Sequence, residues 1–471
     1  MKDLTKGKES SVIFKFAMPM LIGNVFQQLY NMVDSVIVGN YISNDALAAV
    51  GASFYIIFSI CALIIGITIG ASVVVSQYFG AKQFDKVRLT SDTINIFLFF
   101  AAIVISLVGW YFSEDLFRLL GTKEHIIPMA TEYFDILILA SAVPMFGYNG
   151  LAAMLRGVGN SKTPLYFLII STFLNIVLDY VFVVYFGWGI KGVAWATVIA
   201  IAFTWVAMII YLYRTQSMVR LSLKHLKFDN TIFKQSLRVG LPSGVQQTLV
   251  GIGGSVLVVI VNRFDENVLP AFIAAGRVDA FIAMPAMNFA AALSGFVGQN
   301  IAAGHFDRIK RGLRSTLILS NLACVIMTAL ILIFGEDIMR LFVDADVPDS
   351  AEVVRIGKEY LLIICSFYFL FCTMFTLNGV ARGAGATFIP MFITIISLWL
   401  IRVPAAYLLS NTMGEVGIWW SIPLGWAVGC AGAIIYYLSG HWKKSAIVHR
   451  NPTPEEQVEN PDVAKDFTAR I

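Results

Sequence analysis

The chain has 471 residues, of which 58% are hydrophobic and 14% charged, and its formal net charge is +4. With a mean hydropathy of +0.76, this composition excludes a soluble globular protein. The basic residues are scattered over short loops instead of forming one block, which argues against a nucleic-acid-binding surface. We therefore expect an integral membrane protein whose partner is the lipid bilayer and which binds no nucleic acid.

Apolar runs of about 20 residues or more, long enough to cross a bilayer as helices, recur about twelve times. The runs are continuous and lack the alternation of barrel strands, so the predicted fold is an all-α polytopic membrane protein with about twelve transmembrane helices. The segment 1–10 is basic, but the apolar run after it exceeds the h-region of a signal peptide, which predicts an uncleaved first span. In chain order, the predicted spans are 12–38, 46–79, 93–112, 127–154, 163–186, 190–213, 233–262, 270–300, 315–335, 357–381, 388–409 and 414–440.

Lysine and arginine are concentrated in alternate loops, whereas the intervening loops are acidic or nearly uncharged, as in "FDENVL". The positive-inside rule therefore predicts a multi-pass protein of the cell (inner or cytoplasmic) membrane with both termini in the cytoplasm. After His441 the chain becomes charged and contains proline, which predicts a disordered cytoplasmic tail over 441–471. The basic loop residues are Lys82, Lys86, Arg88, Arg156, Lys162, Arg214, Arg220, Lys224, Lys227, Arg308, Lys310, Arg311 and Arg314.

The two halves of the chain repeat one another. "KFAMP" at 15–19 matches "RVGLP" at 238–242, "QYFGAKQFDKVR" at 77–88 matches "QNIAAGHFDRIK" at 299–310, and "RGVGNSKTP" at 156–164 matches "RGAGATFIP" at 382–390. Each half holds about six spans, so the repeat is parallel. We expect an amino-terminal six-helix lobe (1–213), a cytoplasmic linker (214–232) and a carboxy-terminal six-helix lobe (233–440), with a cleft between the lobes that suits alternating access.

Asp34 lies in the middle of an apolar span, where insertion of a carboxylate costs roughly 2.5 to 3.5 kcal/mol, so it needs a partner, a proton or a cation. Asn175 and Asp179 are four residues apart in the fifth span and share one helix face. A rise of 1.5 Å per residue puts Asp34, Asp179 and Thr197 at about one depth, in the outer half of the membrane. Together the four residues are predicted to bind a coupling ion, either Na⁺ through their oxygen atoms or a proton shared by two acids that cannot both ionise cheaply.

Other polar residues within the spans give weaker signals. For Arg402 with Asp279, or Arg277 with an acid, we favour a structural charge pair over a substrate role. Methionine-rich stretches such as "MPAMNF" are more often packing than ligand contacts, although adaptable methionine surfaces suit promiscuous binding. The candidate substrate-cavity residues are Gln27, Tyr30, Asn31, Tyr148, Asn149, Arg277, Asp279, Met284 and Met287.

Motifs for catalysis are lacking. The sequence contains no nucleotide-binding loop, zinc-protease or serine-hydrolase motif, and its histidines are scattered over loops and tail, so we predict no enzyme and no cofactor. The cysteines lie in apolar segments without metal-ligand spacing and are expected to be small buried residues. These are Cys61, Cys324, Cys365, Cys372 and Cys430.

The layout of six plus six spans, the proline at position 19, the acidic first span "YNMVDSVIVG" and the paired "RGxG" turns at Arg156 and Arg382 resemble the multidrug and toxic compound extrusion (MATE) family. The resemblance covers nearly the whole chain except the tail. It implies a secondary antiporter that exports varied, often cationic and aromatic compounds in exchange for H⁺ or Na⁺. It also implies an ion site built from Asp34, Asn175, Asp179 and Thr197.

The second half departs from the first. Leu257 stands at the position that matches Asp34, and the region that matches Asp179 reads "RVPAA". Spans seven and ten offer Gln246, Gln247 and Asn378 where the NorM-like branch of the family has acids. The sequence therefore favours the DinF-like side of the family, without an ion site in the second lobe.

Our leading hypothesis is an ion-coupled exporter of small amphipathic molecules, working as a monomer by alternating access. The alternative is a flippase for a lipid-linked saccharide or another lipid. A flippase for anionic lipids needs cations in its cavity, and only Arg277 and Arg402 are strong candidates, so we favour the exporter. Pro19 is expected to act as a hinge of the first span, because proline removes a backbone hydrogen bond and clashes with the preceding turn.

Overall fold

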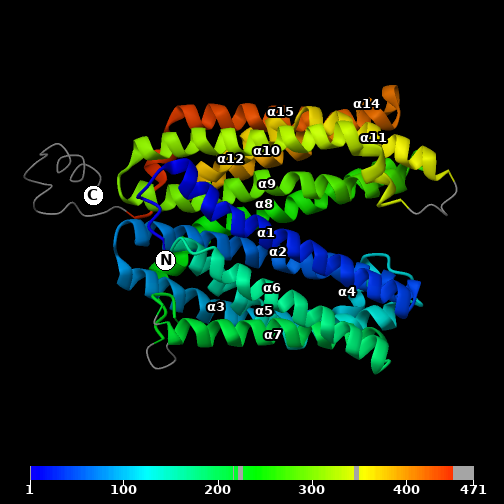
Figure 1. The fold of residues 1–471 in the computed structure, drawn as a ribbon, viewed down its shortest axis with the longest axis horizontal. Helices are drawn as coiled ribbons and strands as arrows, with labels where there is room; N and C mark the ends of the chain where they lie inside the picture. Colours follow the sequence, from blue (N-terminus) through cyan, green and yellow to red (C-terminus); the bar gives the residue numbers. More distant parts are fainter. Residues whose placement is uncertain (1, 216, 221–225, 344–348, 449–471) are drawn as a thin grey trace, which may run out of the picture.

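The computed structural model describes residues 2–215, 217–220, 226–343 and 349–448. Over these residues, eleven helices are long and apolar enough to cross a membrane, or twelve if a bent pair counts as one span, which confirms the predicted all-α membrane fold. Figure 1 shows the helices running roughly parallel along the long axis of the molecule.

The first half of the chain forms one helical bundle, called here the first bundle. Its core lies between α5 and the helices α2, α3 and α7, with α6 packed on α1 and α7. The short helix α4 caps one end against α5. The bounds are α1 Glu9–Tyr41, α2 Asn44–Gly80, α3 Phe84–Tyr111, α4 Ser113–Leu119, α5 Ile127–Gly157, α6 Lys162–Asp179, its π-helical continuation η1 Tyr180–Tyr185, and α7 Gly189–Arg214.

The second half forms the second bundle, whose core lies around α9 and its neighbours α10, α11 and α12. Helices α11 and α12 are the bent pair, with an angle of 52° between them. The bounds are α8 Asn230–Val261, α9 Val268–Ala302, α10 Phe306–Arg340, α11 Ser350–Ser366, α12 Tyr368–Gly383, α13 Phe388–Ile395, the π-helical η2 Ile396–Arg402, α14 Val403–Met413, α15 Glu415–Ser439 and the 3₁₀ helix η3 His441–Ser445.

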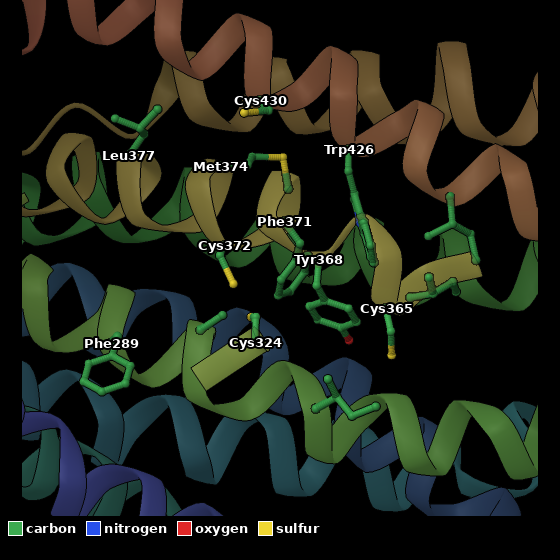
Figure 2. Packing of buried hydrophobic residues seen from close by; sticks show 14 of the residues in the cluster. Phe289, Cys324, Cys365, Tyr368, Phe371, Cys372, Met374, Leu377, Trp426 and Cys430 are labelled. Carbon is green, nitrogen blue, oxygen red and sulfur yellow. The ribbon is translucent and has the colours of Figure 1, made fainter. Parts of the chain in front are cut away.

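Part of the second core is shown in Figure 2, where Phe371 and Trp426 pack with their ring centroids 5.1 Å apart. Four of the five cysteines are buried and the fifth, Cys61, is half-buried, and all five are free. The prediction that they serve as small buried residues therefore agrees with the structure for four of the five, and Cys61 is only partly buried.

The first helix of each half packs partly into the opposite bundle. Val12, Ile13 and Phe16 of α1 belong to the core of the second bundle, whereas Ile232 of α8 belongs to the core of the first. The two bundles also meet where α2 crosses α8, at Gly70 and Ser236 among others. A Cβ atom on Gly70 would collide with the backbone of α8, so only glycine permits this close approach.

Residues 2–8 and 441–448 lie at the same end of the molecule, called here the proximal end, and the opposite end is the distal end (Figure 1). The tail predicted to be disordered from residue 441 onward is therefore ordered over its first eight residues. Residues 441–445 form η3, Trp442 is 2% exposed, and Val448 is buried. The apolar side chains of Trp442, Ile447 and Val448 supply buried surface to this stretch, and the remainder, 449–471, lies outside the described residues.

A π-helical segment interrupts the corresponding helix in each half. In the first bundle, η1 begins directly after Asp179, and in the second bundle η2 ends at Arg402. Such segments in α-helices are rare and frequent at functional sites. The charged residues at these segments, Asp179 before η1 and Arg402 at the end of η2, are therefore candidates for a functional role.

Candidate ion-binding site

The four residues predicted to form an ion site come from three helices of the first bundle. Asp34 lies toward the distal end of α1, Asn175 and Asp179 close α6, and Thr197 lies in the distal half of α7. Because α1 packs on α6 and α6 on α7, the three helices bring these side chains to one depth. The estimate from helix rise alone agrees with this placement.

The polar contacts among these residues are direct. The Asn175 Nδ2 donates to Thr197 Oγ1 at 3.4 Å, and the hydroxyls of Tyr30 and Thr197 are 3.1 Å apart. The carboxyl groups of Asp34 and Asp179 lie close enough to interact with each other. Asp34 is only 6% exposed and Asp179 is fully buried, so water does not solvate the pair freely.

Several oxygen atoms in this cluster have no hydrogen-bond donor. These are Oδ1 of Asp34, both carboxyl oxygens of Asp179 and Oδ1 of Asn175. Neither acid forms an ion pair within 4 Å in the described part of the chain. Buried acceptors are almost always satisfied in native proteins, and a proton or a cation between the oxygens would satisfy this set. Among the described residues, no group of three or more His, Cys, Asp or Glu side chains is placed so that it could hold a metal ion.

Two tyrosines complete the surroundings of the acids, and the sequence analysis did not assign either to the site. Tyr30 bonds to Thr197 as described, and its place in a substrate cavity stays a prediction. Tyr133 of α5 is 6% exposed, and both tyrosines lie within electrostatic range of both carboxyls. Only the packing of α5 against its neighbours reveals Tyr133, because an isolated tyrosine in an apolar run is not distinctive.

A second polar cluster lies inside the second bundle. The hydroxyl of Tyr368 on α12 donates to the Asp279 carboxylate on α9 and lies 3.2 Å from the backbone oxygen of the same residue. Arg402 lies within electrostatic range of Asp279 and of the buried Tyr360. It forms no ion pair within 4 Å with a described residue, and its Nε is buried without a partner. Arg402 and Asp279 thus interact electrostatically beyond ion-pair distance, with Tyr368 as the hydrogen-bond donor of Asp279, and their pairing as a structural charge pair stays a prediction.

Arg277 is separate from this cluster. Its side chain is exposed and lines a surface hollow of about 290 Å³ toward the distal end, together with Leu269, Pro270, Ile273, Ala274 and Phe342. It forms no ion pair with a described residue, so the acidic partner proposed for it is not found within those residues.

The other candidate cavity residues differ in environment. Tyr148 donates to the carbonyl of Pro164 at 3.1 Å, and Asn149 donates within its own helix to Met145. Asn31 donates to Gln28 at 3.3 Å. Gln27 and Met287 are exposed and Met284 is buried. A role of these residues in substrate binding stays a prediction.

Pro19 lies inside α1, which continues without interruption from Glu9 to Tyr41. Its side chain is buried. The helix therefore accommodates proline in this conformation, and the hinge stays a prediction.

A family model described as MatE matches residues 19–181 and again residues 242–408. The chain is 32% identical to "Probable multidrug resistance protein YoeA" of Bacillus subtilis, over 92% of this chain and 94% of that protein, and 31% identical to "Probable multidrug resistance protein YpnP" of the same organism, over 94% and 97%. It also resembles a solved structure described as the outward-facing conformation of a multidrug resistance MATE family transporter, with a TM-score of 0.88, 24% identity, and coverage of 94% of this chain and 99% of that one.

Proposed function

Because the chain belongs to the MATE family, whose members are transporters and not enzymes, we propose that it exports small amphipathic and cationic organic compounds by antiport. The ion exchanged for the substrate is H⁺ or Na⁺, and no cofactor is needed. The observation that carries the proposal is the buried cluster of Asp34, Asn175, Asp179 and Thr197, in which four oxygen atoms lack a donor.

The chemistry of the cluster explains how ion binding would couple to movement. Asp34 lies on α1 and Asp179 on α6, so the repulsion between two ionised carboxylates acts between two helices. A proton or a sodium ion removes that repulsion and supplies the missing partner for the orphaned oxygens. Ion loading therefore favours an arrangement in which α1 and α6 are close, and ion release favours another.

The available driving force is sufficient. A tenfold ion gradient contributes about 1.4 kcal/mol, and the membrane potential adds roughly 2.3 kcal/mol per charge for each 100 mV. Substrate and ion would occupy the protein alternately, so that the inward flow of the ion drives export.

The charges of the loops support an orientation with the proximal end in the cytoplasm, as export from the cell requires. The proximal end carries the basic loops that contain Lys82, Arg88, Arg156 and Lys162, which favours a cytoplasmic position for this end and for both termini. We further propose that the two bundles are the two lobes of the transporter, separated near residues 214–232, and that the protein works as a monomer in the cell membrane.

Purified protein in liposomes tests the proposal. Efflux of a cationic dye is measured with a proton gradient and a sodium gradient imposed separately, and with Asp34→Asn as the matched control. We expect one of the two gradients to drive efflux in the wild type and neither to drive it in the variant. Transport that needs no gradient, or movement of fluorescent lipid without dye transport, would contradict ion-coupled export and favour the flippase.

Pro19 offers a second test. Pro19→Ala restores a backbone hydrogen bond in α1 and stiffens the helix, so we expect slower export with unchanged equilibrium binding of the dye. Export at the wild-type rate would show that no hinge at Pro19 is needed.

A further inference from the structure

Two glutamines at the proximal end occupy corresponding positions in the repeated stretches "QYFGAKQFDKVR" and "QNIAAGHFDRIK". Gln77 lies near the end of α2 in the first bundle, and Gln299 near the end of α9 in the second. Both are fully buried. A buried primary amide needs partners for both its donor and its acceptor groups, and each of these amides finds them outside its own bundle.

Gln299 joins the second bundle to the first. Its Nε2 donates to the carbonyl of Gly157, the last residue of α5, at 3.0 Å. Its Oε1 accepts from the backbone N–H of Leu4 at 2.9 Å. The segment that contains Leu4 is tied to the first bundle as well, since Lys2 N donates to the Val158 carbonyl at 3.3 Å.

Gln77 forms the corresponding contacts in the opposite direction, from the first bundle to the second. Its Nε2 donates to the carbonyl of Gly383, the last residue of α12 in the second bundle, at 3.0 Å. Its Oε1 accepts from the N–H groups of Ile447 and Val448, at 2.8 and 3.1 Å. Each glutamine therefore holds the end of a helix from the opposite bundle and one further segment at the proximal end, and these two segments, 2–8 and 441–448, are called here the straps.

The straps are exchanged between the bundles. Leu4, which precedes the first bundle, is fully buried in the core of the second, and Val448, which follows the second bundle, is 5% exposed in the core of the first. Two glycines with positive φ, Gly159 and Gly385, make room for them, since a Cβ on either would crowd a strap carbonyl. The pseudo-symmetry of the contacts thus extends from the glutamines to the loops that receive the straps.

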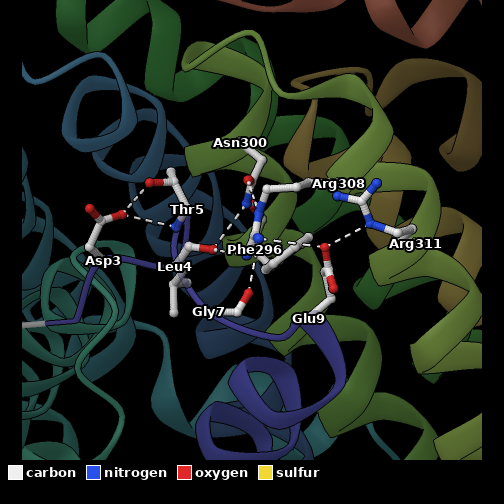
Figure 3. Close-up of polar contacts among 9 residues, drawn as sticks. All are labelled: Asp3, Leu4, Thr5, Gly7, Glu9, Phe296, Asn300, Arg308 and Arg311. Carbon is white, nitrogen blue, oxygen red and sulfur yellow. Dashed lines mark hydrogen bonds and ion pairs between the residues drawn. The ribbon is translucent and has the colours of Figure 1, made fainter.

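Within the described part of the chain, an ionic network holds strap 2–8 but not strap 441–448. Arg308 of α10 donates to the Gly7 carbonyl at 2.9 Å and to Asn300 Oδ1 at 3.1 Å, and Glu9 forms ion pairs with Arg308 and Arg311 at 3.5 and 2.9 Å (Figure 3). The side chains of Arg308 and Glu9 are mostly buried, at 16% and 14% exposed. Strap 2–8 is therefore held by more bonds than the glutamine alone provides.

These contacts lie where two bundles have to separate if the proximal end opens. Polar bonds within a bundle persist in every state of a rigid lobe, but the bonds of Gln77 and Gln299 to carbonyls of the opposite bundle cannot. When they break, both the amides and the helix-end carbonyls become accessible to water, which satisfies them in the open state. Hydrogen bonds that can be exchanged for water suit a gate better than apolar packing alone.

We propose that Gln77 and Gln299 are paired gate residues, which hold the proximal end of the transporter closed by clamping the opposite bundle and a strap. They act as positioning residues and release together when that end opens, and the network of Arg308 makes strap 2–8 the tighter of the two. The proposal rests on the alternating access proposed above, but gate opening is measurable without substrate or ion gradient.

Cysteine labelling measures the opening. Ser236 of α8 is fully buried where α2 crosses α8, so Ser236→Cys in a variant without the native cysteines reports separation of the bundles. A second background that retains only Cys372, fully buried in the second core, reports global unfolding. Both are labelled with a polar maleimide in lipid nanodiscs. The variants are Gln77→Met and Gln299→Met, because methionine keeps the length of glutamine without its hydrogen bonds.

Each substitution is expected to raise the labelling rate at position 236 roughly 3- to 10-fold, and the pair roughly 10- to 100-fold, without a change at Cys372. Gln246→Met is the matched control, since Gln246 donates to Thr394 within the second bundle, at 2.6 Å, and should leave both rates unchanged. Arg308→Gln should raise the rate at position 236 as well, by a smaller factor at high salt, where the ionic network is already weakened.

Two results would overturn the proposal. One is a labelling rate at position 236 that stays at the wild-type value in both single variants. The other is an equal rise in the labelling rates at position 236 and at Cys372, which would show that the glutamines stabilise the whole fold and do not control opening of the proximal end. The single variants decide the matter even if the double variant fails to insert. Because no gradient is applied, loss of the gate and loss of ion coupling remain separate outcomes.

Discussion

The two bundles share a scaffold but fill their interiors with different charges. In the first, the buried acids Asp34 and Asp179 have neighbouring tyrosines and an amide, but no ion pair with a described cation. In the second, the acid Asp279 has a hydroxyl donor in Tyr368 and a guanidinium, that of Arg402, within electrostatic range. The two acids of the first bundle thus have no described cation as an ion-pair partner, whereas the acid of the second bundle has the positive charge of Arg402 within electrostatic range.

The difference shows how a repeated fold can assign one task to one half. Helix positions are equivalent in the two bundles, and a π-helical segment adjoins the charged residue in both. A cluster that already contains a cation needs no ion from solution to balance its acid, whereas Asp34 and Asp179 form no ion pair with a described cation. We therefore expect ion coupling to depend on the first bundle alone.

The largest expected effect separates Asp34 from Asp279. Asp34→Asn and Asp179→Asn should lower gradient-driven export by about 5- to 150-fold, the range of typical coupling energies, while dye binding at equilibrium survives. Asp279→Asn should export within about threefold of the wild type, since its charge is already balanced. Initial rates of dye efflux from liposomes check this, with protein incorporation measured in parallel.

Export at the wild-type rate by both Asp34→Asn and Asp179→Asn would contradict the proposed difference between the bundles, because the two acids would then have only a structural role. A strong loss of gradient-driven export in a normally folded Asp279→Asn variant would also contradict the comparison, because it would assign a coupling role to the second bundle.

Arg402→Met should affect stability more than coupling. The substitution leaves the Asp279 carboxylate without its nearby positive charge, which should cost about 1 to 3 kcal/mol and lower the unfolding temperature in detergent. The double variant Arg402→Met with Asp279→Asn should recover most of that loss, because no uncompensated charge is left. A double variant less stable than Arg402→Met alone would show that the two charges do not compensate each other.

Tyr30→Phe tests the hydroxyl that contacts Thr197. Removing it takes away one hydrogen bond of about 0.5 to 1.5 kcal/mol, so the apparent affinity for the coupling ion should fall roughly 3- to 10-fold. The ion concentration that gives half-maximal efflux measures the change. An unchanged value, with normal expression, would place Tyr30 outside the ion site.

The smallest effect is expected for Tyr368→Phe. It removes the hydroxyl donor of Asp279 and should lower stability by about 1 kcal/mol while export stays within about twofold. Parallel measurement of Tyr30→Phe and Tyr368→Phe compares one hydroxyl in each bundle. Equal effects of both on ion affinity would contradict the assignment of coupling to the first bundle.

Much of the membrane fold could be predicted from the sequence, because a span is a property of local composition. The continuous apolar runs predicted every spanning segment, and the structure gives helices over nearly the same residues, such as Glu9–Tyr41 for 12–38 and Asn44–Gly80 for 46–79. The bend between Ser350–Ser366 and Tyr368–Gly383 was not predicted, since no proline marks it.

The depth of Asp34, Asp179 and Thr197 also follows from the sequence, since helix rise converts residue number into distance along the membrane normal. Rise does not give the direction in which a side chain points, nor which helices are neighbours. For this reason the contact of Tyr30 with Thr197 was not predicted, and Tyr133, Tyr360 and Tyr368 were not assigned at all.

The tertiary structure alone decided the contacts that join distant parts of the chain. The repeat marks Gln77 and Gln299 as equivalent, but no local pattern indicates that each amide reaches the opposite bundle, nor that Leu4 and Val448 are exchanged between cores. Such contacts depend on how two preformed bundles approach each other. Local composition determines helices and depth, whereas the pairing of buried polar groups is determined only when the packed helices leave each donor and acceptor a single partner.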